Sequence, residues 1–323
     1  MNRRCCILYN EPSADAGPDE LDILDQVALV EQQMASIGIE TVRKGITYEF
    51  IKEIEEIRDL NSEFVFNLVE SINNEGQLIY FAPAILNLSA LSYTGCPFES
   101  IFLTSNKPLA LKIMRLGGVP VAQSYRPDEI SRLHFGRQYI IKPIWEDGSM
   151  GITPESVFTY APEDDKRLSQ LAPNHWFLED FIDGREFNVS MFSGPEGPVV
   201  LPPAEIEFRG YGTDRPRIVD FKAKWDTSSF EYHNTVRIFP DNLAQGGLLS
   251  KLREVCLKCW HLFDLKGYAR VDIRTDSKGN VYVLEINANP CIAPDSGFIA
   301  ACRNGGYDLK SVFQGIVADL NRP

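Results

Sequence analysis

The segment from residue 267 to residue 298 constrains the fold more than any other part of this 323-residue chain. Two runs in it, 268–274 and 281–286, alternate apolar and polar residues as half-buried strands do, and a turn-rich run at 276–280 separates them. This pattern predicts a β-hairpin. Such a hairpin decides which side chains share a face, because directly opposed residues project to the same side.

Four polar side chains of this hairpin are expected to converge. If the turn is centred between Lys278 and Gly279, Asp272 lies opposite Glu285, and Arg270 lies opposite Asn287. Two carboxylates and a carboxamide suit Mg²⁺ held together with substrate phosphates, and they do not suit zinc. The alternative is a surface hairpin in which Arg270 forms a salt bridge with one of the carboxylates.

A long polar loop follows the second strand of the hairpin. It contains the turn-forming sequences NANP at 287–290 and PDSG at 294–297. Loops that leave a strand carrying carboxylates are a usual position for substrate contacts. This loop favours a binding site over a plain surface hairpin.

The first third of the chain alternates strands and helices, which predicts a small parallel sheet. The expected elements are a strand at 5–9, a helix at 21–37, a strand at 39–42, a helix at 50–60 and a strand at 63–68. Ligands bind beyond the carboxyl ends of such strands. Asn67, Glu70 and Ser71 are therefore candidate substrate contacts, with capping of the next segment as the alternative.

Two lysines further along the chain have the surroundings of phosphate ligands. Lys107 opens a helix, where the helix dipole disfavours a cation unless an anion lies nearby. Lys142 ends an apolar strand and precedes the glycine-rich run 146–152, whose backbone N–H groups can turn toward an anion. A solvated lysine and an ordinary loop are the alternatives.

Two later segments complete the pattern. An apolar strand at 176–182 leads into a turn and a second strand, in which Phe187, Val189 and Met191 share one face. The run 201–235 is a long polar excursion between strands, and ordered loops of this length often close over a substrate.

Taken in order, these sequences resemble the ATP-grasp ligases, in particular the D-alanine–D-alanine ligase-like branch. GYARVD, LEINANP and the Ser-Gly loop resemble the C-terminal part of that family, and the ordered motifs cover roughly residues 90 to 300. The resemblance implies an α/β (α+β) ATP-grasp fold in three parts. These are a Rossmann-like pre-ATP-grasp domain at 1–101, a small central subdomain at 102–182 and a C-terminal subdomain with the metal site at 183–323.

The resemblance also implies a reaction. A carboxylate attacks the γ-phosphate of ATP, and an amine then displaces phosphate from the acyl phosphate, which forms an amide or peptide bond. The cofactors implied are ATP and two Mg²⁺ ions, with Mn²⁺ as an alternative ion. The partners implied are a small-molecule carboxylate and an amine, one of them an amino acid, and dimers are common in the family, so a homodimer is compatible with the resemblance.

Each site residue takes its role from this resemblance. ATP phosphates would contact Lys107, Lys142, the loop that carries Glu146 and Ser149, and Lys224. Adenine would lie against Glu179 and the backbone of Asp180, Phe181 and Ile182, with Glu186 on the ribose. Asp272, Glu285 and Asn287 would hold the metal ions, Arg270 would stabilise the oxyanion, and Ser296 would hold a second substrate's carboxylate.

The chain departs from the family pattern at three places near the first substrate. The loop at 10–18 lacks the family's glycine-rich phrase and its glutamate, so Glu11 or Asp15 would have to substitute. Gly148 replaces a serine, and Trp225 replaces a tyrosine. These departures favour a substrate other than D-alanine. The alternatives are a D-alanine–D-alanine ligase with a divergent first site and an ATP-binding regulatory protein without turnover.

Composition and charge limit the other function classes. A formal net charge of -13 argues against nucleic-acid and anionic-membrane partners. No apolar run approaches the roughly 18 residues of a membrane span, and no signal-peptide pattern is evident, so we expect a cytoplasmic protein. Seven cysteines fit reduced thiols, and Cys256 and Cys259 lie at helical spacing that favours a core position over metal binding.

Overall fold

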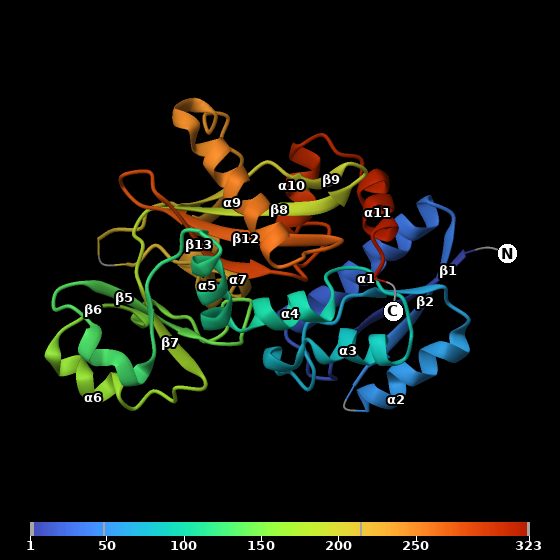
Figure 1. Ribbon diagram of the computed structural model, residues 1–323, viewed down its shortest axis with the longest axis horizontal. Helices are drawn as coiled ribbons and strands as arrows, with labels where there is room; N and C mark the ends of the chain where they lie inside the picture. Colours follow the sequence, from blue (N-terminus) through green and yellow to red (C-terminus); the bar gives the residue numbers. More distant parts are fainter. Residues whose placement is uncertain (1–2, 48, 214, 322–323) are drawn as a thin grey trace.

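A computed structural model describes residues 3–47, 49–213 and 215–321, which form three β-sheets with helices packed against them (Figure 1). The blue N-terminal sheet lies to one side in Figure 1, the green small sheet to the other, and the largest sheet above them. Short 3-10 helices lie at Glu56–Leu60, Gly76–Leu78, Pro127–Arg132, Pro154–Ser156, Pro162–Asp164 and Gln245–Gly247.

The N-terminal sheet has three parallel strands in the order β2-β1-β3, as the alternating pattern predicts. Its strands are β1 (Arg3–Asn10), β2 (Ile39–Ile46) and β3 (Phe64–Asn67), and its helices are α1 (Pro18–Ser36), α2 (Phe50–Glu55) and α3 (Phe81–Leu88). Helix α1 begins three residues earlier than expected because Pro18 fits the first helical turn. The helix expected at 50–60 changes to a 3-10 helix after Glu55 and ends at Asn61, which has a φ of 52°.

The small sheet is antiparallel, with the order β4-β7-β5-β6. Its strands are β4 (Ser124–Tyr125), β5 (Gln138–Pro143), β6 (Val157–Thr159) and β7 (Trp176–Asp180), and the short helix α6 (Asp165–Leu168) lies beside them. The strands predicted around Lys142 and Glu179 are therefore neighbours. In the register of β5 and β7, Lys142 lies opposite Phe177 and Ile140 lies opposite Glu179.

The largest sheet has the order β11-β10-β8-β12-β13, with β9 paired to β8. Its strands are β8 (Arg185–Gly194), β9 (Gly197–Val200), β10 (Ala204–Phe208), β11 (Thr235–Ile238), β12 (Tyr268–Thr275) and β13 (Val281–Asn287). The predicted hairpin is β12–β13, and Asp272 lies opposite Glu285 and Arg270 opposite Asn287, as expected. The register shifts by one residue after Asp272, so that Ile273 pairs with Val283.

Helices from both halves of the chain cover this large sheet. The side chains of Phe187, Val189 and Met191 are fully buried on one face of β8 and belong to the same core as α4 (Phe98–Ser105), α5 (Lys107–Leu116) and α9 (Leu248–Leu262). Helix α5 therefore presents its first residue, Lys107, toward the hairpin: it contacts β13. The predicted core position of Cys256 and Cys259 is confirmed, since both thiols are fully buried.

The last two helices tie the C-terminal part to the N-terminal sheet. α10 (Gly297–Asn304) and α11 (Leu309–Ala318) share a core with β1, β3 and α1, and Figure 1 shows α11 between β8 and the N-terminal sheet. Two short helices, α7 (Phe221–Trp225) and α8 (Phe230–Asn234), lie within the excursion between β10 and β11. All seven cysteines are free thiols. In the described part of the chain, no helix combines the length and apolar character needed to cross a bilayer.

Candidate active site

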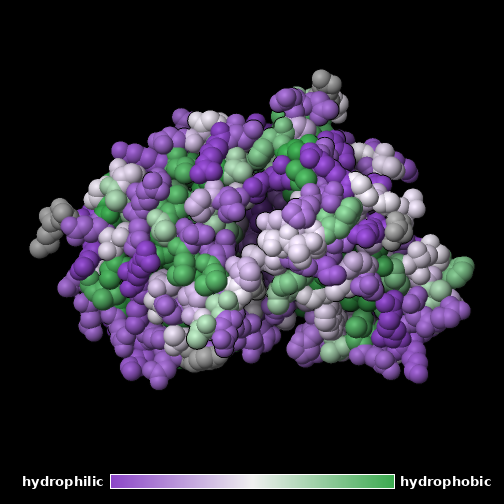
Figure 2. Space-filling view, turned by 180° about the vertical axis from the view of Figure 1, so that it is seen from behind, coloured by the Kyte–Doolittle hydropathy of each residue, from purple (hydrophilic) through white to green (hydrophobic). Residues whose placement is uncertain are grey.

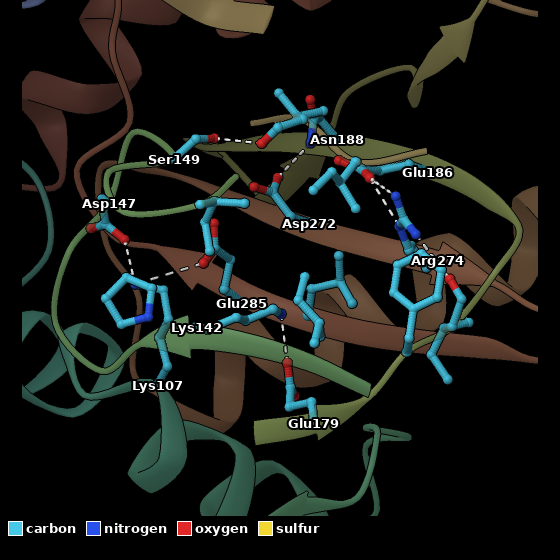
Figure 3. A pocket seen from close by; sticks show the side chains of 18 of the residues that line it. Lys107, Lys142, Asp147, Ser149, Glu179, Glu186, Asn188, Asp272, Arg274 and Glu285 are labelled. Carbon is cyan, nitrogen blue, oxygen red and sulfur yellow. Dashed lines mark hydrogen bonds and ion pairs between the residues drawn. The ribbon is translucent and has the colours of Figure 1, made fainter. Parts of the chain in front are cut away.

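A cleft of about 960 Å³, partly open to solvent, lies between the small sheet and the β12–β13 hairpin. Figure 2 shows that the rear face of the molecule is hollowed near its middle, with hydrophilic residues around the hollow. The predicted site residues that line the cleft are Lys107, Lys142, Glu146, Ser149, Glu179, Asp180, Phe181, Ile182, Glu186, Lys224, Arg270, Asp272 and Glu285. Segments far apart in the sequence thus supply one site (Figure 3).

Two predicted site residues make local contacts and are not among the residues that line the cleft. The Asn287 side-chain oxygen accepts a hydrogen bond of 3.0 Å from the Asn289 backbone N–H. The Ser296 hydroxyl caps α10 by accepting a 3.2 Å hydrogen bond from the Ile299 N–H. In this structure Asn287 orders the turn after β13, and Ser296 begins a helix.

The Asp272 carboxylate is held on the hairpin by two neighbours. Arg270 donates to both of its oxygens, at 2.7 and 2.8 Å. The Asn188 amide donates to the same carboxylate at 2.8 Å (Figure 3). The Arg270 contact is the salt bridge considered as an alternative, but it lies inside the cleft. Asn188 was missed in the sequence analysis, although strand alternation places it on the face opposite Phe187 and beside Glu186.

The Glu285 carboxylate faces a group of cations. The Lys107 ammonium, only 6% exposed, lies 3.7 Å from Glu285 and 2.9 Å from Asp147, and it also donates to the Glu146 carbonyl at 2.7 Å. Burial acts to raise the pKa of Glu285, but the nearby positive charges outweigh it, and the pKa is lowered. The cations responsible are Lys107, Lys142, Arg270 and Lys224. Glu285 is therefore held ionised at the centre of the cleft.

The glycine-rich loop after β5 is tied to helix α7. Gly148 and Ser149 have φ values of 65° and 66°, so the chain turns sharply there. The Ser149 hydroxyl donates to the Val219 carbonyl at 2.7 Å, and the Trp225 indole donates to the Gly148 carbonyl at 3.2 Å. These two hydrogen bonds hold the excursion that contains α7 across the loop.

Lys224 on α7 lines the cleft without a close counter-charge. No ion pair within 4.0 Å includes it among the described residues. Burial and the neighbouring Arg270 lower the pKa of Lys224. A negatively charged ligand in the cleft would relieve both effects.

The other end of the cleft carries a buried carboxylate with an unsatisfied oxygen. Glu179 is 1% exposed, and one of its oxygens lies 2.5 Å from the Lys142 ammonium. The other oxygen, Oε1, has no hydrogen-bond partner among the described residues. A buried acceptor without a partner is rare, and here it lines a cleft that can admit a donor.

Arg274 supports the same end of the cleft and was also missed in the sequence analysis. Its guanidinium donates to Glu186 at 2.7 and 2.9 Å and to the Ile182 carbonyl at 2.9 Å, and it lies over the Phe181 ring at 5.2 Å. The signal was present: β12 alternation places Arg270, Asp272 and Arg274 on one face. Arg274 orders three residues predicted to contact a nucleotide.

The carboxylates of the cleft fit Mg²⁺ held with phosphate oxygens. No group of three or more His, Cys, Asp or Glu side chains able to hold a metal occurs in the described ranges. The hairpin brings together two carboxylates, Asp272 and Glu285, surrounded by cations that suit a polyphosphate. Mg²⁺ is typically bound by one or two carboxylates plus substrate phosphates, which matches this donor set.

The fold and the cleft define an ATP-grasp enzyme, an ATP-dependent ligase that forms C–N bonds. Residues 133–318 match the family model described as D-ala D-ala ligase C-terminus. This match covers more than half of the chain, so the protein belongs to that family, and the predicted ATP-grasp fold and carboxylate-amine ligase activity are confirmed.

Individual relatives agree with the family assignment. The chain is 27% identical over 269 residues to the uncharacterized protein y4sG of Sinorhizobium fredii, covering 81% of this chain and 75% of that protein. It is 24% identical over 271 residues to the D-alanine–D-alanine ligase of Mannheimia succiniciproducens, covering 80% and 81%.

Solved structures share the fold. The D-alanine–D-alanine ligase of Bacillus anthracis has a TM-score of 0.74 at 18% identity, covering 98% of this chain and 97% of that one. The VanG D-Ala:D-Ser ligase of Enterococcus faecalis has a TM-score of 0.73 at 16% identity, covering 98% and 99%. At these identities the likeness shows the fold alone.

Proposed function

We propose that this ligase activates the carboxylate of an amino acid or a similar small molecule as an acyl phosphate in the described cleft. The observation that carries the proposal is the group of four cations around Glu285 and Asp272 in one cleft. Phosphoryl transfer depends on positioning and on stabilising negative charge, and this arrangement supplies both.

The nucleotide base would occupy the end of the cleft near Glu179. Its unpartnered Oε1 would accept a hydrogen bond from the exocyclic amine of adenine, and the Ile182 backbone would meet the base edge. Glu186, held by Arg274, would accept from the ribose hydroxyls. One structural relative, the Bacillus anthracis ligase, has been solved in complex with ATP, with a TM-score of 0.70.

The phosphates would then extend toward the hairpin. Lys107, Lys142 and Lys224 would neutralise them, and the loop with Glu146 and Ser149 would close over them, since it is already tied to α7. A substrate carboxylate oxygen attacks the γ-phosphorus, the bond to the β-phosphate bridging oxygen breaks, and ADP leaves. The amine attacks the acyl carbon, and Arg270 stabilises the oxyanion before phosphate departs, an effect worth about 3 kcal/mol per donor.

Asp272 and Glu285 would hold Mg²⁺, with Asn287 joining them if its side chain turns from the Asn289 amide. When bound, the ions would neutralise charge on the transferring phosphoryl group. Ser296 remains the candidate for a second substrate's carboxylate, because its hydroxyl, which accepts from the Ile299 N–H, can still donate its own hydrogen to an anion at this helix N-terminus.

Three parts of the chain are proposed to divide these tasks. Residues 1–101 would supply the substrate side, 102–182 the small nucleotide-binding sheet, and 183–323 the metal hairpin. The three sheets fall within these ranges. Helices α4 and α5 pack on the large sheet, so the first part of the central segment links the two nucleotide-binding sheets.

The first substrate is proposed to differ from D-alanine. The Glu11 side chain packs against Tyr9 and Gly45 on neighbouring strands, and the Trp225 indole contacts the loop at Gly148. D-alanine–D-alanine ligation is the second candidate, favoured by the Mannheimia succiniciproducens relative.

A phosphate-release screen over pairs of D- and L-amino acids and small carboxylates, with ATP and Mg²⁺, tests the proposal. We expect one pair to release phosphate and ADP in equal amounts. Turnover with D-alanine alone would instead support the second candidate. Nucleotide binding without turnover for any pair would contradict the ligase proposal and favour a regulatory role.

A further inference from the structure

The Lys107 ammonium is fixed in place at the wall of the cleft. Lys107 is the first residue of α5, its backbone N–H donates to the Ile144 carbonyl at 3.1 Å, and its side chain is buried. The ammonium donates to the Glu146 carbonyl at 2.7 Å and to an Asp147 carboxylate oxygen at 2.9 Å, and it lies 3.7 Å from Glu285. An ammonium group has three hydrogens to donate, and three protein oxygens already surround this one. A phosphate oxygen can therefore bind Lys107 closely only if one of these oxygens moves away.

Asp147 is the one of the three acceptors that can move without disturbing the fold. The Glu146 acceptor is a backbone carbonyl, and Glu285 lies within β13. The Asp147 side chain is 48% exposed, and its carboxylate makes no hydrogen bond within the described ranges other than the one to Lys107. Open space lies beside the next residue, because a Cβ added at Gly148 would meet no atom of the described residues within 4 Å. Rotation of the Asp147 side chain alone would free Lys107.

The chain on both sides of Asp147 is held by contacts with other segments. The Glu146 carboxylate packs against Gly76, where an added Cβ would lie 3.1 Å from it. The Gly148 carbonyl accepts a hydrogen bond of 3.2 Å from the Trp225 indole. The Asp147 carboxylate is thus a movable group on an anchored loop.

Asp147 brings its negative charge to the part of the cleft proposed for the phosphates. Figure 3 shows its ion pair with Lys107, and Asp147 lines the cleft together with Lys224 and Arg270. Burial acts to lower the pKa of Lys107, but Asp147 and Glu285 outweigh burial, and the pKa is raised. Lys107 therefore stays charged, and the Asp147 carboxylate and a phosphate are alternative anions for the same cation.

We propose that Asp147 is an autoinhibitory residue: its carboxylate occupies the position on Lys107 that a nucleotide phosphate oxygen takes, so that nucleotide binding must displace it. The inference rests on the proposed function, in which the phosphates of ATP reach Lys107. Displacement of Asp147 subtracts from the binding free energy of the nucleotide, and the return of the carboxylate to Lys107 helps ADP to leave after turnover. Asp147 therefore weakens the binding of ATP and of ADP alike.

Calorimetric titration of Asp147→Asn with ATP and with ADP tests this role and does not require the amino-acid substrates to be known. Asparagine keeps the shape of the side chain and removes its charge. The Kd for each nucleotide should fall about three- to fivefold, the range expected for a partly exposed ion pair. The decrease should appear both with and without Mg²⁺, because the competition is for Lys107. If Asp147→Asn does not fold, Asp147→Ser, which also lacks the charge, should show the same decrease.

Asp128→Asn is the matched control. Asp128 is 61% exposed, pairs with Arg126 at 2.9 Å and is not among the residues that line the cleft. The substitution removes the same charge from the protein, so it measures the effect of net charge on nucleotide binding. Its Kd for ATP should stay within about 1.5-fold of the wild-type value, since salt screens charges that lie far from the ligand.

A Kd for ATP that does not fall in both conditions would overturn the inference. A rise in both would show that Asp147 positions Lys107 for the nucleotide, and a rise confined to Mg²⁺ would identify Asp147 as a metal ligand. Wild-type protein that binds no ATP would overturn the proposed function and the inference together. A failure confined to the Asp147 variant would leave the proposed function standing, so the two failures are distinguishable.

Discussion

Replacing Lys142 with methionine tests how much the buried ion pair between Lys142 and Glu179 contributes to the free energy of unfolding. Glu179 is 1% exposed, its Oε2 lies 2.5 Å from Lys142, and its Oε1 has no partner among the described residues. Lys142→Met would leave a buried carboxylate without its cation, a change that typically lowers the free energy of unfolding by about 3 to 5 kcal/mol.

The loss should depend on pH in a defined direction. Burial already raises the pKa of Glu179, and Lys142 is the main group that opposes this. Without Lys142 the folded-state pKa rises further above the unfolded value of about 4.3. The destabilisation is therefore absent below that value and grows as the pH increases toward the folded-state pKa, because the folded protein then holds a proton that the unfolded chain releases.

Urea unfolding at pH 5 and at pH 8, followed by tryptophan fluorescence, measures this effect. Lys258→Met is the control, because Lys258 and its partner Glu254 are exposed, and surface pairs contribute about 0 to 1 kcal/mol. The double variant Lys142→Met/Glu179→Gln should recover most of the loss. A loss below about 1 kcal/mol at pH 8, or one equally large at pH 5, would refute the reasoning.

Three further variants test other parts of the site. Arg270→Met should reduce phosphate release at least about 100-fold while the Kd for ATP, measured by calorimetry, stays nearly unchanged; equal loss of both would contradict an oxyanion role. Arg274→Met should destabilise the protein by about 3 to 5 kcal/mol in urea unfolding, whereas Arg209→Met, at the exposed pair with Glu207, should lose no more than about 1 kcal/mol, and similar losses would contradict the importance of burial. Trp225→Phe removes the hydrogen bond to Gly148, worth about 1 kcal/mol, so hydrogen exchange of the loop 146–151 should be about fivefold faster, and an unchanged rate would show that the contact does not hold the loop.

The sequence predicted the hairpin well because its signals are local. Alternation in the two strands and the turn residues between them were enough to place Asp272 opposite Glu285. The one-residue shift after Asp272 was not predicted, although the buried residues of β13 change phase there, from Val281 and Val283 to Ile286.

Contacts between distant segments could not be predicted in the same way. The Lys142–Glu179 pair joins neighbouring strands of a sheet whose strand order differs from the chain order. Gln26 on α1 forms hydrogen bonds with Glu70, 44 residues away, and with Ile292, 266 residues away. The sequence around Gln26 contains no local signal for either contact. Asn287 and Ser296 were predicted to bind ligands. In the structure their side chains instead accept hydrogen bonds from backbone N–H groups two and three residues further along the chain.

The central claim is that a substrate carboxylate attacks the γ-phosphate of ATP in this cleft. Turnover of a substrate whose carboxylate carries ¹⁸O at both oxygens, followed by mass spectrometry of the released phosphate, tests it most directly. We predict one ¹⁸O atom in each phosphate, because the acyl phosphate breaks at its acyl carbon when the amine attacks. Unlabelled phosphate would mean that water attacks ATP, and it would contradict the claim.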